Sequence, residues 1–340
     1  MGGNFCGSKI RKRSKSPPHP LNTNLLPEPL AIYSDSRYFK PRQQSYYNHL
    51  LLEEAPLLEI SSPDKWETAE IIGSGSFGRV LFGRDLTTNE LLAIKEIPLI
   101  GLTNFPAISE EVQILSELQH PNIVRYLGSK TTSECLLIFM EYVSGGTIRS
   151  LLIKHNSFSE SLIRVYTYQV LKGLEYLHYH NIVHRDIKGT NILVTKEGNC
   201  KLADFGSAKK ILGLEMTSSV TGTINWMAPE VINETGHGRY ADIWSIGCLV
   251  VEMATGKPPW SNFKNHLDII IEVCQTDKYP FLPENFSDDA RSFVSLCFKR
   301  LPWNRPNVGE LLQHPFVSQL EAPEMFRTDS TKFLSDNPNK

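Results

Sequence analysis

Short apolar runs on either side of a glycine cluster open the patterned part of the chain. Ile71-Ile72 leads into the segment 73–78, Gly-Ser-Gly-Ser-Phe-Gly, and the run 80–82, Val-Leu-Phe, follows it. Runs of this length that are rich in β-branched and aromatic residues are typical of strands. The pattern therefore predicts two strands joined by a glycine-rich loop, whose backbone N–H groups can approach a phosphate because glycine has no Cβ.

A helical pattern and another strand-like run follow this unit. Four apolar residues recur at helical spacing, and these are Ile108, Val112, Leu115 and Leu118. They predict a helix over 108–118, while the run 136–140, Leu-Leu-Ile-Phe-Met, predicts a short strand. A G-x-G-x-x-G motif also occurs in dinucleotide-binding folds, but there a helix follows the glycines directly. A strand-like run follows them here, so that alternative is disfavoured.

Charged and amide side chains occur downstream at fixed offsets. The segment 184–191 reads His-Arg-Asp-Ile-Lys-Gly-Thr-Asn, and Asp-Phe-Gly follows at 204–206. Phosphoryl transfer needs a base that orients the incoming hydroxyl, cations that absorb charge on the phosphate oxygens, and oxygen ligands for those cations. Four residues supply these groups, namely Asp186, Lys188, Asn191 and Asp204. Either tripeptide alone occurs by chance, but both in this order favour a phosphoryl-transfer site.

The segment 176–186, Tyr-Leu-His-Tyr-His-Asn-Ile-Val-His-Arg-Asp, resembles the catalytic loop of eukaryotic protein kinases, and residues 66–317 support the resemblance. It implies an α+β, two-lobed protein kinase fold, with a small mainly β N-lobe that contains one key helix and a larger mainly α C-lobe. The expected divisions are a mostly disordered tail (1–65), the N-lobe (66–140), the hinge (141–146), the C-lobe (147–317) and a short C-terminal tail (318–340).

The same resemblance implies a role for each polar residue of the site. Asp186 is expected to accept the proton of the substrate hydroxyl, and Lys188 to neutralise charge on the transferred phosphoryl group. Asn191 and Asp204 are expected to hold Mg²⁺ against the phosphates of ATP, as hard oxygen ligands do.

Lys95, in the run Leu92-Ala93-Ile94-Lys95, resembles the lysine that anchors the ATP phosphates. The family pattern makes Glu111 its acidic partner, with Glu110 as the alternative. Glu111 lies on the predicted helix, so the ion pair would join that helix to the strand of Lys95.

The adenine pocket is expected around the hinge. Backbone groups of Glu141 and Val143 would bind the adenine edge, and Met140 would close the back of the pocket. The expected ATP-binding residues are Ile72, Gly73, Ser74, Gly75, Ser76, Phe77, Gly78, Val80, Ala93, Lys95, Glu111, Met140, Glu141, Val143 and Leu193. Its apolar members fit ordinary core packing equally well, so they add little independent weight.

The polar segment 207–223 resembles an activation loop. Arg185 lies beside the catalytic aspartate, and a cation there is stabilised when an anion joins it. We therefore expect a phosphate on this segment to order it, with Ser219 as the main regulatory phosphorylation site and Thr221 as the alternative.

Three further residues are expected to support the fold rather than the reaction. Glu230 is expected to pair with Arg305, and Asp242 to brace the backbone of the catalytic loop. Both expectations follow from the resemblance, and these residues are outside the candidate site.

A few residues indicate the class of kinase. Gly-Thr-Asn after Lys188 is typical of serine/threonine kinases, and the segment 220–232 looks most like the MEKK branch of mitogen-activated protein kinase kinase kinases. The implied partners are protein substrates, a MAP kinase kinase in particular. Ile224 departs from the proline usual at its position.

There are two alternative functions. One is a nucleotide-binding pseudokinase scaffold, which is disfavoured because six residues of the site are retained, namely Lys95, Glu111, Asp186, Lys188, Asn191 and Asp204. The other is a kinase for small molecules or lipids, which is disfavoured by the segment 221–230.

Composition limits the remaining possibilities. The chain has 340 residues, net charge −2 and 41% hydrophobic residues, enough for two cores, and its near-neutral charge argues against bulk nucleic-acid binding. The chain has six cysteines, at positions 6, 135, 200, 248, 274 and 297, and no two of them form a C-x-x-C pair. Those from Cys135 to Cys297 are expected to be reduced, buried thiols. No apolar run approaches the ~18 residues of a membrane span, and no secretory signal is apparent, which favours a cytoplasmic protein.

The first 65 residues are rich in Pro, Ser, Asn and Tyr and have few periodic apolar positions. Their start, Met1 to Cys6, resembles an N-myristoylation signal, which makes Gly2 and Cys6 lipidation candidates, although Cys6 stands where Ser or Thr is preferred. A basic cluster follows, made of Lys9, Arg11, Lys12, Arg13 and Lys15. Lipid plus cluster would suffice for peripheral membrane association, while a solvated basic tail and a nuclear localisation signal remain open.

Overall fold

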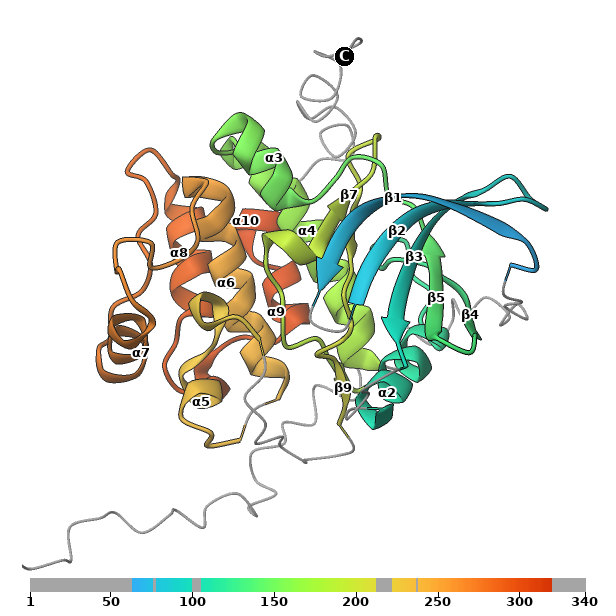
Figure 1. The fold of residues 1–340 in the computed structure, drawn as a ribbon. Helices are drawn as coiled ribbons and strands as arrows, with labels where there is room; N and C mark the ends of the chain where they lie inside the picture. Colours follow the sequence, from blue (N-terminus) through green and yellow to red (C-terminus); the bar gives the residue numbers. More distant parts are fainter. Residues whose placement is uncertain (1–62, 76–77, 100–104, 212–221, 237, 320–340) are drawn as a thin grey trace, which may run out of the picture. The chain divides into compact units, whose positions relative to one another are not determined.

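The computed structural model describes residues 63–75, 78–99, 105–211, 222–236 and 238–319, which form a β-rich N-lobe and a larger helical C-lobe (Figure 1). The α+β, two-lobed architecture expected from the sequence is therefore confirmed. The order of its elements explains how distant catalytic segments meet.

The N-lobe contains a five-stranded antiparallel sheet with strand order β1-β2-β3-β5-β4. Its strands are β1 (Trp66–Gly75), β2 (Gly78–Asp85), β3 (Leu91–Pro98), β4 (Tyr126–Thr131) and β5 (Cys135–Glu141). Leu92 and Ile94 of β3 pack with Leu137 and Phe139 of β5 in a small core, because alternate residues of a strand point to the same face. The two strands predicted around the glycine cluster are β1 and β2.

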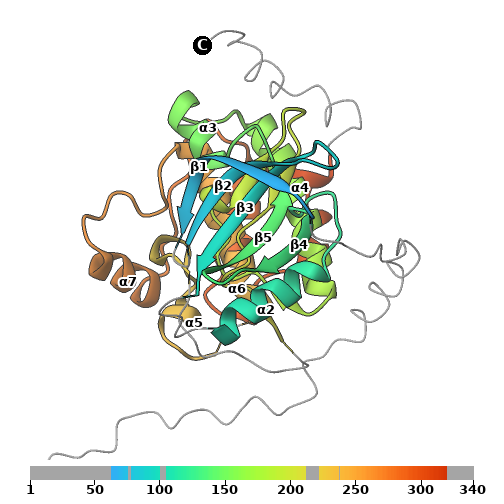
Figure 2. The ribbon, with the colours of Figure 1, turned by 45° about the vertical axis from the view of Figure 1, so that its right-hand side comes forward.

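One helix, α2 (Phe105–Ser116), packs against β4 of this sheet (Figure 2). Ile108 and Leu115 are buried at the helical spacing recognised in the sequence, while Val112 is half-buried. The predicted helix is thus present, and its buried face positions the neighbouring Glu111 towards the lobe interior.

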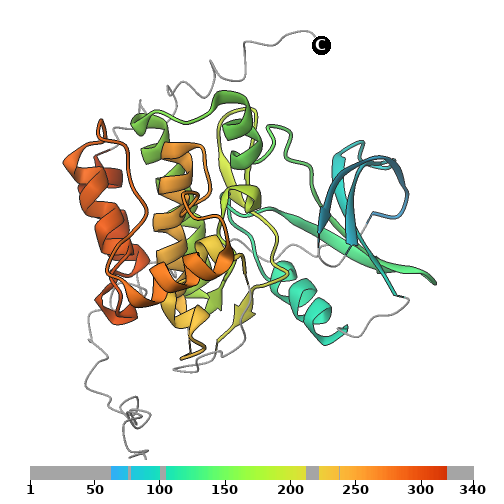
Figure 3. The ribbon, with the colours of Figure 1, turned by 60° about the vertical axis from the view of Figure 1, so that its left-hand side comes forward.

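The C-lobe is built around α6 (Arg239–Thr255), which packs on α4 (Glu160–Tyr179) and α8 (Asp288–Cys297) (Figure 3). Every residue of α6 from Ala241 to Ala254 is buried, because the helix is apolar on most of its circumference. The remaining helices are α3 (Ile148–His155), α5 (Pro229–Ile232), α7 (His266–Gln275), α9 (Val308–Leu312) and α10 (Pro315–Ser318), and the 3₁₀ turns are η3 (Gly189–Asn191), η4 (Ile224–Trp226) and η5 (Pro302–Asn304).

Four very short strands hold the catalytic segments. They are β6 (Ile182–Val183), β7 (Ile192–Val194), β8 (Cys200–Leu202) and β9 (Lys209–Lys210), with β6 paired to β9 and β7 to β8. The segment 184–191 connects β6 to β7, and the segment 203–208 connects β8 to β9. The two pairings therefore place His-Arg-Asp and Asp-Phe-Gly side by side.

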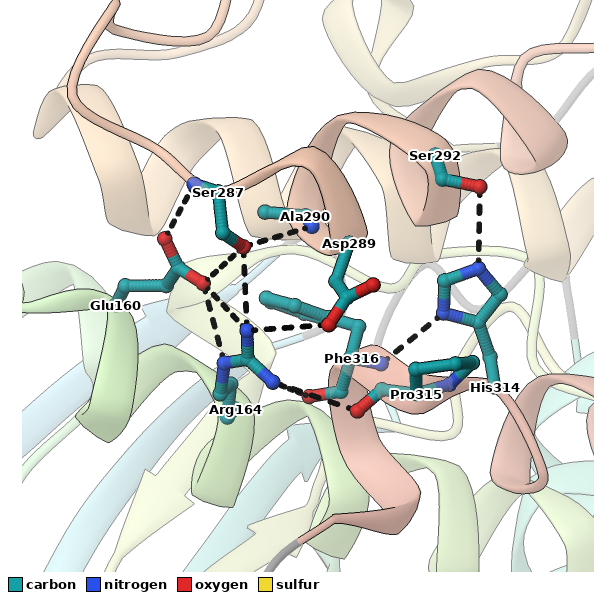
Figure 4. Close-up of polar contacts among 9 residues, drawn as sticks. All are labelled: Glu160, Arg164, Ser287, Asp289, Ala290, Ser292, His314, Pro315 and Phe316. Atoms are coloured by element: carbon teal, nitrogen blue, oxygen red, sulfur yellow. Dashed lines mark hydrogen bonds and ion pairs between the residues drawn. The ribbon is translucent and has the colours of Figure 1, made fainter.

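A polar network joins α4, α8 and α10 (Figure 4). The Arg164 guanidinium donates to Glu160 Oε1 at 2.8 and 3.1 Å and to Ser287 Oγ at 3.1 Å. It also donates to the carbonyl oxygens of Pro315 and Phe316 at 3.3 and 3.2 Å. One side chain thus satisfies groups on three helices or their caps.

The expectation that every cysteine from Cys135 to Cys297 is buried is corrected in part. All five are free thiols, and Cys200, Cys248 and Cys297 are buried, but Cys135 and Cys274 are half-buried. Cys135 is the first residue of β5, beside a turn, and Cys274 lies on α7, of which only Ile269 and Val273 are buried. No helix within the described ranges combines the length and apolar character needed to cross a bilayer.

Candidate active site

The Asp186 carboxylate is the centre of the site and is 9% exposed. Lys188 Nζ donates to its Oδ2 at 2.7 Å, and Asn191 Nδ2 donates to the same oxygen at 2.8 Å. Thr223 Oγ1 donates to Oδ1 at 3.2 Å. Three donors from two segments therefore fix the orientation of a carboxylate that remains an acceptor, as a general base requires.

Thr223 is a site residue that sequence reasoning missed, since it was considered only as a member of the activation loop. Its hydroxyl also accepts a hydrogen bond from Lys188 Nζ at 2.6 Å. The preceding Gly222 has φ +114°, and a Cβ there would lie 2.8 Å from the carbonyl oxygen of Arg185. Glycine at this position therefore allows the close approach, and the Thr-Gly-Thr pattern at 221–223 was the signal available.

Asn191 and Asp204 supply the oxygen atoms that a hard cation prefers. The Asn191 amide nitrogen is engaged by Asp186. Its amide oxygen accepts from Thr190 Oγ1 at 3.2 Å and, with a second lone pair, is the atom that could bind a cation. Ala203 N donates to the Asn191 carbonyl oxygen at 2.9 Å, so Asp204 lies one residue from a direct contact with Asn191. The Asp204 carboxylate is exposed, and the donor set fits Mg²⁺, which binds one or two protein oxygens together with phosphate and water.

The predicted Lys95–Glu111 ion pair is present. Lys95 Nζ, on β3, lies 2.6 Å from Glu111 Oε1, on α2, and 3.6 Å from Asp204 Oδ1. Burial raises the pKa of Glu111 above its ordinary value, and the charge of Lys95 opposes that rise. Lys95 therefore connects the sheet, the helix and the Asp-Phe-Gly segment in the described part of the site.

Buried carboxylates of α6 and α5 support this geometry, as expected. Asp242 Oδ2 accepts from His184 N at 3.0 Å, and its Oδ1 accepts from Arg185 N at 2.8 Å. Burial opposes the charge of Asp242, but hydrogen bonds, including one with His178, lower its pKa overall. The expected Glu230–Arg305 pair is bidentate, with separations of 2.5 and 2.9 Å.

Two site residues adopt left-handed backbone conformations although they are not glycine. Arg185 has φ +66° and Asp204 has φ +60°. Such conformations cost of order 1–3 kcal/mol each and persist where the surroundings enforce them, often at functional sites. For Arg185, the bond from its N–H to Asp242 supplies part of that enforcement.

The predicted adenine-pocket residues come from both lobes. Val80 on β2 is paired with Lys95, and Ala93 on β3 is paired with Met140 on β5. Val80, Ala93, Met140 and Leu193 are all half-buried, whereas Val143 is buried.

Glu141, the last residue of β5 and the first of the expected hinge, is held by polar contacts on both sides. Its backbone N–H donates to the carbonyl oxygen of Arg125 at 3.0 Å, and its Oε1 accepts from Arg125 N and from Lys201 Nζ, each at 2.7 Å. The carbonyl oxygen, rather than the N–H, is therefore the backbone atom of Glu141 to consider for adenine.

Several predicted residues lie outside the described part of the chain. Ile72, Gly73, Ser74 and Gly75 lie on β1 and Gly78 begins β2, but Ser76 and Phe77 are outside it. The phosphorylation candidates Ser219 and Thr221 and the lipidation candidates Gly2 and Cys6 are also outside it.

Comparison with known proteins gives a consistent result. The family model described as "Protein kinase domain" matches residues 66–317. "Mitogen-activated protein kinase kinase kinase A" of Dictyostelium discoideum is 42% identical over 287 residues, which cover 82% of this chain and 30% of that protein. From Arabidopsis thaliana, "Mitogen-activated protein kinase kinase kinase 2" is 45% identical over 291 residues (82% and 44%), and "Mitogen-activated protein kinase kinase kinase 3" is 48% identical over 275 (78% and 42%). The chain spans less than half the length of these relatives.

Proposed function

The chain belongs to the protein kinase family, and we propose that it transfers the γ-phosphate of ATP to serine or threonine hydroxyls of protein substrates. The observation that carries the proposal is the Asp186 carboxylate, fixed by Lys188, Asn191 and Thr223 but still able to accept a proton. A hydroxyl that donates to Asp186 would be oriented for attack on phosphorus, while Lys188 would stabilise charge on the transferred group.

The proposed cofactors are ATP and Mg²⁺. Asn191 Oδ1 and the Asp204 carboxylate would hold Mg²⁺, which when bound would neutralise charge on the phosphate oxygens. Lys95, oriented by Glu111, would bind the phosphates, and the glycine-rich turn between β1 and β2 would cover them. Val80, Ala93 and Leu193 would enclose adenine, with Met140 behind it and Glu141 and Val143 offering backbone groups to its edge.

The proposed substrate is a MAP kinase kinase, and the chain would act as a MAP kinase kinase kinase. Support comes from relatives that carry this name at 42–48% identity. A pseudokinase scaffold is the alternative, and it is disfavoured because Lys95, Glu111, Asp186 and Asp204 are all retained and the Lys95–Glu111 pair is formed.

The test is incorporation of labelled γ-phosphate from Mg-ATP into a generic basic protein and into a catalytically inactive MAP kinase kinase. The Asp186→Asn variant is the matched control, because it keeps the side-chain volume and removes the acceptor charge. Transfer that depends on Asp186, with preference for the MAP kinase kinase, is expected. No transfer by protein phosphorylated on its activation loop would support the scaffold alternative.

The divisions expected from the sequence define this proposal further. We take 66–140 as the N-lobe, 141–146 as the hinge and 147–317 as the C-lobe.

We also propose that phosphorylation of Ser219, or else of Thr221, regulates the activity. Ser219→Ala is expected to lower activity in protein phosphorylated at no other activation-loop site, and full activity of that variant would contradict the assignment.

For the tail 1–65 we propose peripheral membrane association of a cytoplasmic protein, through Gly2, Cys6 and the basic cluster. The mechanism predicts that Ser14→Asp/Ser16→Asp reduces partitioning of the lipidated protein onto vesicles that contain phosphatidylserine, because added negative charge weakens attraction to anionic lipid. Unchanged partitioning would count against it.

A further inference from the structure

One face of α6 carries polar contacts to both loops of the site. Asp242 holds the backbone of the catalytic loop, the segment 184–191, as described above. One turn further on, Ser245 Oγ donates to the carbonyl oxygen of Trp226 at 2.9 Å, and Cys248 Sγ donates to that of Asn225 at 3.7 Å. These two contacts hold the substrate loop, which we define as residues 222–230. The next residue on this face is Glu252, at the i, i+4 spacing from Cys248.

Glu252 differs from these neighbours because one of its oxygens contacts both loops. Its Oε2 accepts from the backbone N–H of Gly189 at 2.9 Å and from the indole Nε1–H of Trp226 at 3.1 Å. The residue is 1% exposed. Burial raises its pKa, while the two hydrogen bonds and, to a smaller extent, the charges of Arg149 and Lys188 oppose that rise, so both donors help to stabilise the carboxylate.

At the catalytic loop, the Glu252 carboxylate fills the space beside Gly189. A Cβ on Gly189 would lie 2.7 Å from Glu252 Oε1 and 2.9 Å from its Cδ. The carboxylate therefore occupies the space that any side chain at position 189 would need. Gly189 directly follows Lys188 and is the first residue of η3, which ends at Asn191. A displacement of the Gly189 backbone would therefore also move Lys188 and Asn191.

The substrate-loop end of the link is equally close to the reacting groups. Trp226 N donates to the carbonyl oxygen of Thr223 at 2.8 Å, and the Thr223 hydroxyl contacts Asp186 and Lys188. The two loops thus meet directly at Thr223 and a second time through Glu252. Two separated contacts fix their relative orientation better than one, since a single contact leaves rotation free.

We propose that Glu252 is a positioning residue that couples the substrate loop to the catalytic loop, so that the acceptor hydroxyl and Asp186 are aligned together. This inference rests on the proposed kinase function. It predicts that losing the link lowers kcat for phosphorylation of a protein substrate more than it raises KM for ATP, because Glu252 contacts none of the residues assigned to ATP binding and reaches the metal ligand Asn191 only through the backbone of Gly189.

The experiment uses the full chain with Mg-ATP and an inactive MAP kinase kinase, and it compares Glu252→Leu, Glu252→Gln, Trp226→Phe and the double variant Glu252→Leu/Trp226→Phe. Glu252→Leu is expected to lower kcat by about tenfold or more, the loss expected for charge-assisted hydrogen bonds at a site. Glu252→Gln should fall between this variant and the unchanged chain, because its amide oxygen can still accept both hydrogen bonds. Ser245→Ala, on the same face but without a contact to Gly189, is the matched control for loss of a bond to the substrate loop alone.

Non-additivity is the decisive readout. Trp226→Phe keeps the ring and removes the indole donor, so in the Glu252→Leu background it should cause no further fall in kcat. A double variant whose loss is the product of the two single losses would overturn the proposal. The proposal would also be overturned if the Glu252 variants lowered the thermal unfolding midpoint but left kcat unchanged, with kcat calculated for the molecules that can bind nucleotide. That result would indicate a structural role only. Absence of transfer by the unchanged chain would instead contradict the proposed function itself.

Discussion

At the residue scale, the Lys95–Glu111 pair permits a test that separates two adjacent glutamates. Glu111 is 3% exposed and lies 2.6 Å from Lys95, whereas Glu110 is exposed. Glu111→Gln keeps the volume but weakens the orientation of Lys95, so we expect kcat/KM for ATP to fall about tenfold or more. Glu110→Gln is the matched control and should stay within about twofold. Steady-state kinetics on both variants checks this, and a larger loss in Glu110→Gln would favour the alternative pairing.

The catalytic and metal-binding residues predicted from the sequence lie in two short motifs, at 184–191 and 204–206. Asp186, Lys188 and Asn191 lie within six residues of each other, so spacing alone brings them together. Thr223 and Glu252 were missed because they reach the site through tertiary contacts, 35 residues from Lys188 and 63 residues from Gly189 respectively. Threonine is common in polar segments, so the Thr-Gly-Thr pattern at 221–223 is only a weak signal for Thr223. A glutamate in a mostly apolar helix can make many kinds of structural contact, so the local pattern indicates no role for Glu252.

At the scale of elements, Arg164 is expected to determine how firmly α4, α8 and α10 are held together (Figure 4). Its side chain is 19% exposed, donates to Glu160, Ser287 and two carbonyl oxygens, and lies over the Phe316 ring at 5.0 Å. Arg164→Ala should lower the free energy of unfolding by about 2 kcal/mol, because several partly buried acceptors lose their donor. Denaturant unfolding measures this change.

The matched control for this prediction is Arg84→Ala. Arg84 is 48% exposed and makes an ion pair with Glu67 at 3.8 Å, a surface contact of the kind that contributes about 0–1 kcal/mol. Equal losses in the two variants would show that the network joining the three helices adds nothing beyond a surface charge.

Elements with strong periodicity were predictable, but their ends were not. The pattern that ends at Leu118 predicted a helix to that residue, whereas α2 ends at Ser116. Glu117 N and Leu118 N donate to carbonyl oxygens three residues back, at 3.2 Å each, so the last turn tightens and Leu118 is buried outside the α-helix. The two-residue strands β6 and β9 carry no pattern of their own, because only pairing between distant segments defines them.

At the scale of the whole described unit, a few polar contacts join the two lobes. Lys201 Nζ of β8 lies 2.7 Å from Glu141 Oε1 at the end of β5, and Lys210 Nζ of β9 lies 2.8 Å from Glu117 Oε2. Val124 N donates to the carbonyl oxygen of Leu202 at 2.9 Å. The two-lobed fold was predictable from the order of the motifs. The contacts between the lobes were not, because the two side-chain pairs join residues that are 60 and 93 positions apart in the sequence, so no local pattern indicates them.

Three histidines with lowered pKa values, His120, His178 and His314, are expected to make this unit sensitive to acid. Burial is the main reason that the pKa of His120 falls from 6.5 to about 4, with Lys172 and Lys201 lowering it further and Glu175 opposing them, and burial also lowers the pKa of His178. Below the ordinary pKa the unfolded chain therefore binds protons that the folded chain resists, so stability is present above about pH 6.5 and is lost as pH falls towards 4.

Substituting one of these histidines should reduce the acid sensitivity of the fold. His120 Nδ1 accepts from Asn122 N at 3.1 Å and its ring stacks on Tyr176, so His120→Gln will cost some stability at neutral pH. The difference between the thermal midpoints at about pH 7.5 and about pH 5 should nevertheless be smaller in this variant than in the unchanged chain, because one group with a depressed pKa has been removed. His266→Gln is the matched control, since an exposed imidazole is solvated before and after unfolding. If the His120 variant loses as much stability on acidification as the unchanged chain, proton uptake by other groups must cause the loss.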